Sequence, residues 1–326
     1  MIGFIKAFLS VLLSAINLFA FPVFGNFTAK NEPIDPANCK LNFAAISDIH
    51  MTDSLRAFML GFGLYDMENA DSRLDALVCS GDITDHGRIE EWEMLVKAFE
   101  GYDPAENIIL AQGNHDTWTE DEGYNLAKDY FIKYSEQITG RKIENEYYST
   151  KVNGYTFIVL ASEADRTSMY LSDAQLQWFE SEMAKAAADN LPIFVICHWP
   201  LNQSHGLPVT WGDDDMEPDD GGIGDQSAAV EAILKKYNNV FYINGHIHNG
   251  LSNESQEKFN GYVTVESDGS FHSINLPQYM YMSPRGRVSN GTGCQFEVYE
   301  DRVEIRSRSY SASVWYTDYN FTIPLV

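Results

Sequence analysis

Residues 41–50 read LNFAAISDIH, and residues 240–248 read VFYINGHIH. Each stretch is a short apolar run that ends in polar or glycine residues and then histidine. A run of this length, bounded in this way, is typical of a buried β-strand. In an extended segment residues i and i+2 point the same way, so Asp48 and His50 can share one ligand, as can His246 and His248. The two stretches therefore predict buried strands that end in a polar site.

The same pattern continues along the chain, where short apolar runs alternate with helical stretches. Strands are expected at Leu41–Ser47, Leu74–Ser80, Asn107–Gln112, Thr156–Ala161, Ile193–Cys197 and Val240–Asn244. Helices are expected at Ser54–Asn69, Arg88–Phe99, Tyr124–Tyr134, Ser172–Ala188 and Gln226–Tyr237. Alternation of this kind predicts an α/β sandwich in which helices cover the sheets.

The chain changes character after Gly250. It reads there as short alternating strands, YVTVES, FHSINL, CQFEVYE and RVEIRSRSY, with turns between them. We expect these strands to add antiparallel pairs to the same core, because no linker rich in proline or serine marks a boundary. One domain is therefore predicted over residues 41–326.

The conspicuous polar residues follow the predicted strands, where ligands of α/β sheets gather. They are Asp48 and His50, Asp82 and Asp85, Asn114, His115 and Asp116, then His198, and finally His246 and His248. Taken singly, an Asp-x-His, a Gly-Asp or a histidine at a strand end has a structural explanation as a turn, a loop or a hydrogen-bonded side chain. With His86, which follows Asp85, six of the 8 histidines lie in these segments, and one metal site explains the placements together.

In this order, the motifs D-x-H, G-D-x-x-D, G-N-H-D, a strand-end histidine and G-H-x-H resemble the signature of the calcineurin-like metallophosphoesterases. The resemblance spans Asp48 to His248. The strands downstream of His248 also resemble the C-terminal part of exported and cyclic-nucleotide-phosphodiesterase-like members of the family. It implies a four-layer α/β/β/α sandwich with a dinuclear metal centre. It also implies that Asp48, His50 and His248 hold the first metal, that Asn114, His198 and His246 hold the second, and that Asp82 bridges them.

The chemistry of these side chains agrees with that implication. Imidazole, carboxylate and amide ligands without cysteine suit two ions of zinc, manganese or iron. A bridging carboxylate holds two ions roughly 3.5–4 Å apart, where they can share a hydroxide and clamp phosphoryl oxygens. We therefore expect metal-dependent hydrolysis of a phosphomonoester or phosphodiester. The alternative is a metal-binding interaction domain of the same fold without turnover.

Three further residues accompany the expected ligands. In the family, the histidine matching His115 faces the substrate and protonates the leaving group or stabilises the transition state. The carboxylate matching Asp85 orients that histidine, which would raise the pKa of the imidazole. Asp116 is either a support for the ligands or a helix N-cap, and the N-cap is favoured.

The chain has 22 Lys+Arg against 47 Asp+Glu, a formal charge of -25. A negative field of this size repels polyanions, so a small phosphate-ester substrate is expected and nucleic acid is not. An insertion, Leu201–Asp225, carries Trp211 and the acidic run Asp213–Asp220 between two strands that bear ligands. It is a solvated acidic loop, a lid that selects substrate, or an additional cation site made by the clustered carboxylates, and the solvated loop is favoured over the cation site.

The first residues read as a targeting segment, because Lys6 is followed by an apolar stretch with no charge until Lys30. A cleavable secretory signal peptide over residues 1–25 is expected, then a linker over 26–40. An uncleaved membrane anchor is the alternative. Either would place the rest of the chain outside the cytoplasm. In an oxidising compartment, Cys39 and Cys294 are the pair that could form a disulfide.

Overall fold

A computed structural model describes residues 30–118, 123–164, 169–211, 217–253, 261–280 and 291–326. The predicted signal peptide and the start of the predicted linker lie outside these residues. In the described part of the chain, no helix has the length and apolar character needed to cross a bilayer.

The first of two sheets has seven strands, and its centre is built from the N-terminal part of the chain. β1 (Leu41–Ile46), β2 (Ala76–Ser80) and β3 (Asn107–Ala111) are parallel neighbours in that order. On the other side of β1 lies β10 (Thr292–Val298), antiparallel to it, and then β11 (Arg302–Ser309). The short strands β12 (Val314–Trp315) and β13 (Phe321–Pro324) both pair with β11.

The second sheet has six strands. Its four inner strands are mutually parallel, in the order β5 (Tyr155–Val159), β6 (Ile193–Ile196), β7 (Val240–Asn244) and β9 (Phe271–Asn275). The edges are β4 (Tyr148–Val152) beside β5 and β8 (Val265–Ser267) beside β9, both antiparallel.

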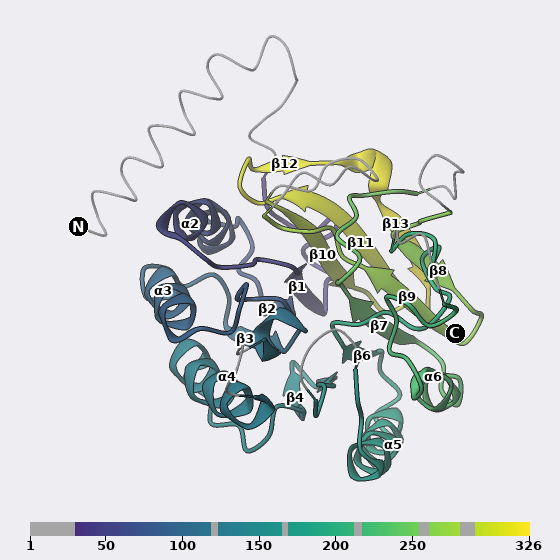
Figure 1. The fold of residues 1–326 in the computed structure, drawn as a ribbon. Coiled ribbons are helices and arrows are strands. Elements are labelled where there is room, and N and C mark those ends of the chain that lie inside the picture. Colours follow the sequence, from purple (N-terminus) through teal and green to yellow (C-terminus); the bar gives the residue numbers. More distant parts are fainter. Residues whose placement is uncertain (1–29, 119–122, 165–168, 212–216, 254–260, 281–290) are drawn as a thin grey trace.

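Helices cover the outer face of each sheet, so the molecule has four layers (Figure 1). On the first sheet lie α2 (Ser54–Glu68), α3 (Ile89–Phe99) and α4 (Tyr124–Thr139), with the short η1 (His115–Thr117) after β3. The second sheet carries α5 (Asp173–Ala187) and α6 (Ser227–Leu234), and η3 (Thr317–Tyr319) precedes β13. This is the α/β/β/α sandwich that the sequence predicts.

The alternation of side chains along β1 explains the layering. Phe43 and Ala45 belong to the core between the two sheets, whereas Ala44 and Ile46 belong to the core beneath α2 and α3. Successive side chains of a strand point to opposite faces, so a strand buried on both faces is apolar throughout. Phe43 stacks on Phe296 of β10, with ring centroids 4.7 Å apart, and meets Phe157 of β5 edge-on at 5.2 Å.

The five predicted helices are confirmed, with ends that differ by a few residues. The strand β4 was missed because its residues alternate between half-buried and exposed and form no apolar run. The expectation that all C-terminal strands pair antiparallel is wrong for β9, which is parallel to β7. Alternation in a sequence identifies a strand but not its direction.

The four cysteines are free. Cys294 lies opposite Ala45, at one end of the β1–β10 pair, whereas Cys39 precedes Leu41, at the other end. Four residues of strand separate these levels, about 13 Å at the usual rise, and a disulfide spans less than 7 Å between α-carbons. The possible pairing of Cys39 with Cys294 is therefore wrong for this structure.

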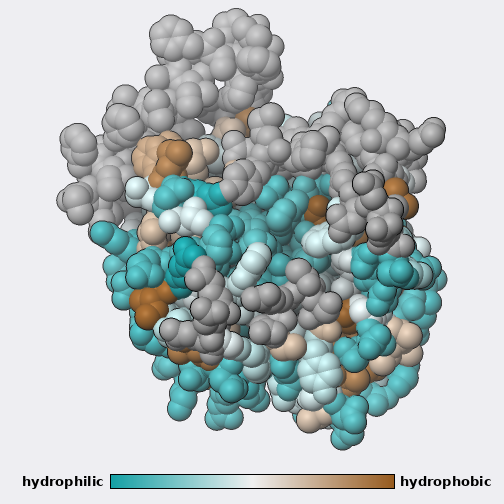
Figure 2. Space-filling model, viewed as in Figure 1, coloured by the Kyte–Doolittle hydropathy of each residue, from teal (hydrophilic) through white to brown (hydrophobic). Residues whose placement is uncertain are grey.

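On the face seen in Figure 2, hydrophilic side chains cover most of the coloured surface, and hydrophobic ones form small separate patches. One of these patches lies in the region of α2, whose Leu55 and Phe58 are exposed. Isolated apolar side chains of this kind are normal on a protein surface.

Candidate metal centre

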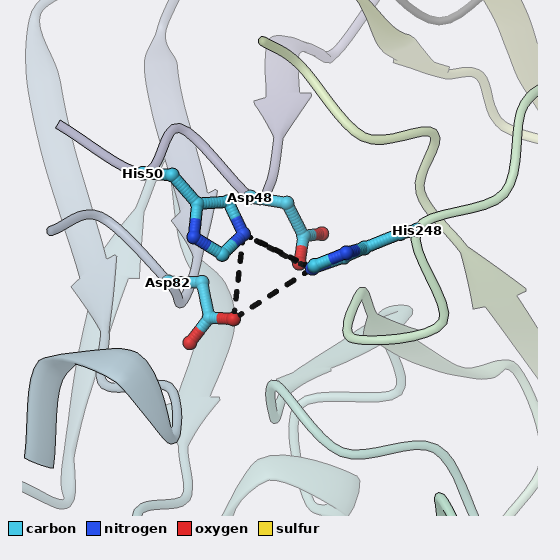
Figure 3. Close-up of side chains that lie close together, drawn as sticks. All are labelled: Asp48, His50, Asp82 and His248. Atoms are coloured by element: carbon cyan, nitrogen blue, oxygen red, sulfur yellow. Dashed lines mark hydrogen bonds and ion pairs between the residues drawn. The ribbon is translucent and has the colours of Figure 1, made fainter. Parts of the chain in front are cut away.

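The predicted ligands come together where the loops after β1, β2, β3, β6 and β7 meet. The hydroxyl of Ser80, at the end of β2, donates to the main-chain oxygens of Cys197 and Ile243 in the second sheet. The ends of the two sheets are thereby joined directly beneath the site. Figure 3 shows Asp48, His50, Asp82 and His248 converging from three of these loops.

The loops that carry the ligands have unusual backbone geometry. Asp48, His50, Asp82, His246 and His248 all have positive φ angles, between 48° and 73°. Such conformations cost of order 1–3 kcal/mol each and cluster at functional sites. Asp48 and His50 therefore approach one another through a left-handed loop and not, as the sequence suggested, along an extended segment.

Two glycines are required by close packing at the centre. A β-carbon on Gly81, whose φ is +91°, would lie 2.6 Å from the His198 ring. A β-carbon on Gly245 would lie 2.0 Å from Oγ of Ser47 and 2.5 Å from Oδ2 of Asp48. Any side chain at either position would displace a predicted ligand.

The first group of ligands is Asp48, His50, Asp82 and His248. Nε2 of His248 lies 3.1 Å from Oδ1 of Asp48 and 3.0 Å from Nε2 of His50. Nε2 of His50 lies 3.7 Å from Oδ2 of Asp82. Four donor atoms thus surround one small space.

The second group contains Asp82 again, with His198 and His246. Nε2 of His198 lies 3.2 Å from Oδ2 of Asp82 and 3.2 Å from Nδ1 of His246. Oδ1 of Asn114 is 2.8 Å from the same Nδ1. Because Asp82 belongs to both groups, its carboxylate lies between two candidate ion positions.

These donor sets fit two cations. Oδ2 of Asp82 is buried and makes no well-formed hydrogen bond among the described residues, although three imidazole nitrogens lie 3.2–3.9 Å from it. Burying a carboxylate oxygen without a partner is costly, and a cation at this position removes the cost. Nitrogen and oxygen ligands without a thiolate suit zinc, manganese or iron.

The electrostatics of the site favour positive charge. Burial alone would raise the pKa of Asp82, but the neighbouring His198 and His248 hold it well below its usual range. Burial would likewise lower the pKa of His198 and His248, yet Asp82 and Asp48 raise these values to about 9 and about 10. A field that favours the protonated form of these two imidazoles also attracts metal ions, which displace those protons on binding.

Hydrogen bonds from a ligand histidine to a residue outside its group fix which of its ring nitrogens faces the candidate ion position. Nδ1 of His50 donates to Oδ1 of Asp85 over 2.9 Å, and Nδ1 of His198 donates to the main-chain oxygen of Ser80 over 2.8 Å. Such contacts select the tautomer whose Nε2 is free to bind a metal. In this structure the Asp85 carboxylate supports His50, whereas the resemblance assigns it to His115.

His115 lies beside the ligands and is 22% exposed. Its main-chain N–H donates to Oδ1 of Asp82 over 2.9 Å, and its Nδ1 donates to the main-chain oxygen of Asp85 over 2.7 Å. Oδ1 of Asp85 is farther away, at 3.6 Å. The ring of Trp118 lies 5.5 Å from the His115 imidazole, centroid to centroid, with planes inclined by 59°.

Asp116 is not the helix N-cap that the sequence favoured, because Asn114 occupies that position. Its carboxylate is fully buried and accepts hydrogen bonds from the main chain of Ile83, Thr84 and Gly113 and from the Thr84 hydroxyl. Burial and the nearby Asp82 raise the pKa of Asp116 to about 6. Asp116 therefore ties together the loops that carry Asp82 and Asn114.

Sequence reasoning gave no role to His205, which lies in the insertion 201–225. His205 is fully buried, and its Nδ1 donates to the main-chain oxygen of Val263 over 2.8 Å. Its Nε2 lies 2.9 Å from the Ser273 hydroxyl on β9. Nothing in the local sequence marks this histidine, because its partners come from distant parts of the chain.

Comparison with known proteins is consistent with this geometry. Residues 41–250 match the family model described as calcineurin-like phosphoesterase. A search of curated proteins found no match.

Three solved structures with the same fold are each 14% identical in sequence to this chain. One is a dimetal phosphatase from Danio rerio, with a TM-score of 0.58 over 89% of this chain and 100% of that one. Another is the purple acid phosphatase PPD1 of yellow lupin, with a TM-score of 0.59 over 87% of this chain and 53% of the lupin chain. The third is GAP50, described as the anchor in the inner membrane complex of Plasmodium, with a TM-score of 0.56 over 88% and 90%.

Proposed function

The chain belongs to the calcineurin-like phosphoesterase family, and on that basis we propose that it hydrolyses a phosphomonoester or phosphodiester at a two-metal centre. The observation that carries the proposal is the position of Asp82. Its carboxylate is common to both groups of ligands, and its Oδ2 is buried without a well-formed hydrogen bond among the described residues. Two ions bound there would lower the pKa of water toward neutrality and withdraw charge from the phosphoryl oxygens.

The remaining residues of the site have roles that follow from their positions. The side chains of His115 and His248 are 22% and 37% exposed, whereas the predicted ligands other than His248 are buried. A substrate therefore approaches the site from the side of these two histidines. The main-chain oxygen of Asp85 holds the proton on Nδ1 of His115. Protonated at both nitrogens, this imidazole can deliver the Nε2 proton to the leaving oxygen.

The overall charge supports a small substrate. With a formal charge of -25, the protein repels long polyanions, while a small ester with one or two charges is affected far less. We further propose that the chain acts outside the cytoplasm, on the basis of the apolar N-terminal segment.

Metal analysis and substrate assays on the same preparation test the proposal. Protein purified without chelator should contain close to two ions of zinc, manganese or iron per chain. It should hydrolyse at least one member of a panel of p-nitrophenyl phosphate, bis-p-nitrophenyl phosphate, cyclic nucleotides and phosphodiester lipids. Asp82→Asn should lose most of both the metal and the activity, because it removes a charge shared by the two ions.

The second candidate function is a metal-binding interaction domain without turnover. It is favoured by the likeness to GAP50, which is described as an anchor. A preparation that holds two ions but hydrolyses no member of the panel would support this alternative. Unchanged turnover and near-complete metal content in Asp82→Asn would contradict the bridging role of Asp82.

A further inference from the structure

The insertion between β6 and β7 extends back to the metal centre. The indole of Trp211 lies nearly parallel to the imidazole of His246, with ring centroids 4.5 Å apart and planes inclined by 20°. Trp199, which follows β6, has its ring centroid 5.9 Å from that of the same imidazole, and the two ring planes are inclined by 40°. The ring of His246 is thus packed among aromatic side chains.

His246 differs from the other buried imidazoles in how it is held. His50 and His198 each donate a hydrogen bond from the ring nitrogen that faces away from the ions. Nδ1 of His246 faces Asn114 and His198, while its Nε2 is buried and has no hydrogen-bond partner among the described residues. Since no hydrogen bond to Nε2 fixes the plane of this ring, stacking on Trp211 takes over that role.

Trp211 is itself held by contacts with described residues of the insertion. A β-carbon on Gly221, whose φ is +74°, would lie 3.0 Å from the indole of Trp211, so the main chain packs against that ring. The ends of the insertion are joined by two hydrogen bonds between Asn202 and Gly224, of 3.0 and 2.9 Å. The hydroxyl of Thr210 donates to the main-chain oxygen of the buried His205.

We propose that Trp211 is a positioning residue for the second metal site, and that it orients His246 by stacking. The insertion is then a structural part of the metal centre as well as a surface loop. This inference rests on the proposed two-metal centre but not on turnover, because it concerns the affinity of the second ion.

Titration of the metal-free protein with Mn²⁺ in a calorimeter tests this role. The unaltered protein should bind two ions. Trp211→Ala should weaken the binding of one of them on the order of 10–100-fold, the usual effect of losing a group that orients a ligand. Trp211→Phe keeps an aromatic ring and should recover most of that loss. Trp178→Ala is the matched control, because Trp178 is also partly buried in an aromatic contact, with Tyr147, but lies on α5.

Each outcome bears on the proposal. If Trp211→Ala binds both ions as the unaltered protein does, or if Trp211→Phe binds as poorly as Trp211→Ala, orientation by stacking is wrong. Circular dichroism identifies a variant that fails to fold; if Trp211→Ala does, Trp211→Leu, which fills the space without an aromatic ring, replaces it in the comparison with Trp211→Phe. If the unaltered protein binds two ions but hydrolyses no ester, the proposed function fails while the role of Trp211 stands. If it binds fewer than two, both fail.

Discussion

Oδ1 of Asp85 accepts a hydrogen bond from Nδ1 of His50 over 2.9 Å. This contact keeps the proton of His50 on Nδ1, so that Nε2 faces Asp82 and His248. The same aspartate contacts His115 through its main-chain oxygen. Its side chain and its main chain therefore support two different histidines.

Replacing the Asp85 side chain tests its contact with His50 separately from the main-chain contact with His115. Asp85→Ala removes the acceptor for His50 but keeps the main-chain oxygen that binds His115. We expect metal affinity to fall on the order of 10–100-fold, while the dependence of rate on leaving-group pKa stays unchanged at saturating metal. Calorimetric titration with Mn²⁺ and rates for a series of aryl phosphates measure the two effects. A steeper leaving-group dependence with unchanged metal affinity would favour the role that the family resemblance assigns to Asp85.

His115→Ala should keep both ions, because no predicted ligand is lost. The rate should fall on the order of 10²–10⁴-fold, the usual contribution of a positioned proton donor. The rate should fall most for esters with poor leaving groups. Equal losses for p-nitrophenyl phosphate and an alkyl phosphate would show that His115 does not protonate the leaving group.

Asp116→Asn should destabilise the metal-free fold. The amide nitrogen of asparagine would face main-chain N–H donors that now bind a carboxylate oxygen. We expect the free energy of unfolding in urea, measured with chelator present, to fall by about 1–3 kcal/mol. Asp129→Asn, on an exposed position of α4, should change it by less than about 0.5 kcal/mol. Equal stability of the two variants would mean that Asp116 does not hold the loops together.

Neutralising the acidic run tests whether it screens substrates. The six acidic residues within Asp213–Asp220 would be changed to Asn or Gln. Trp211 and Gly221 are kept, because Trp211 stacks on His246 and Gly221 packs against Trp211. Relative activity on short oligonucleotides should rise at low salt, and the gain should shrink as salt increases. If the variant ranks its substrates as the unaltered protein does at every ionic strength, the run is only a solvated connection.

The fold could be predicted largely from the sequence, because its strands are apolar and its polar residues follow them directly. The convergence of Asp48 and Asp82 was predictable for the same reason, since β1 and β2 are parallel and end at one edge, whereas His248 joins them because the two sheets pack with the ends of β2 and β7 together. The contacts of His205 were not predictable, and for Asp116 the sequence offered support of the ligands only as the less favoured of two roles. Their partners are main-chain groups and side chains brought together only by folding, and such contacts leave no periodic signal. The direction of β9 was not predictable either, because the alternation of apolar and polar residues is the same in a parallel and an antiparallel strand.

The place of β10 next to β1 has a consequence for biosynthesis. Leu41 pairs with Val298, and Phe43 pairs with Phe296, so one edge of β1, whose other edge pairs with β2, lacks its neighbour until the ribosome has made residues 292–298. Pairing of such distant segments is slow, and an unpaired strand edge is prone to aggregation. We therefore expect truncation before residue 292 to weaken the metal centre, because it exposes one edge of β1, although every predicted ligand precedes that residue.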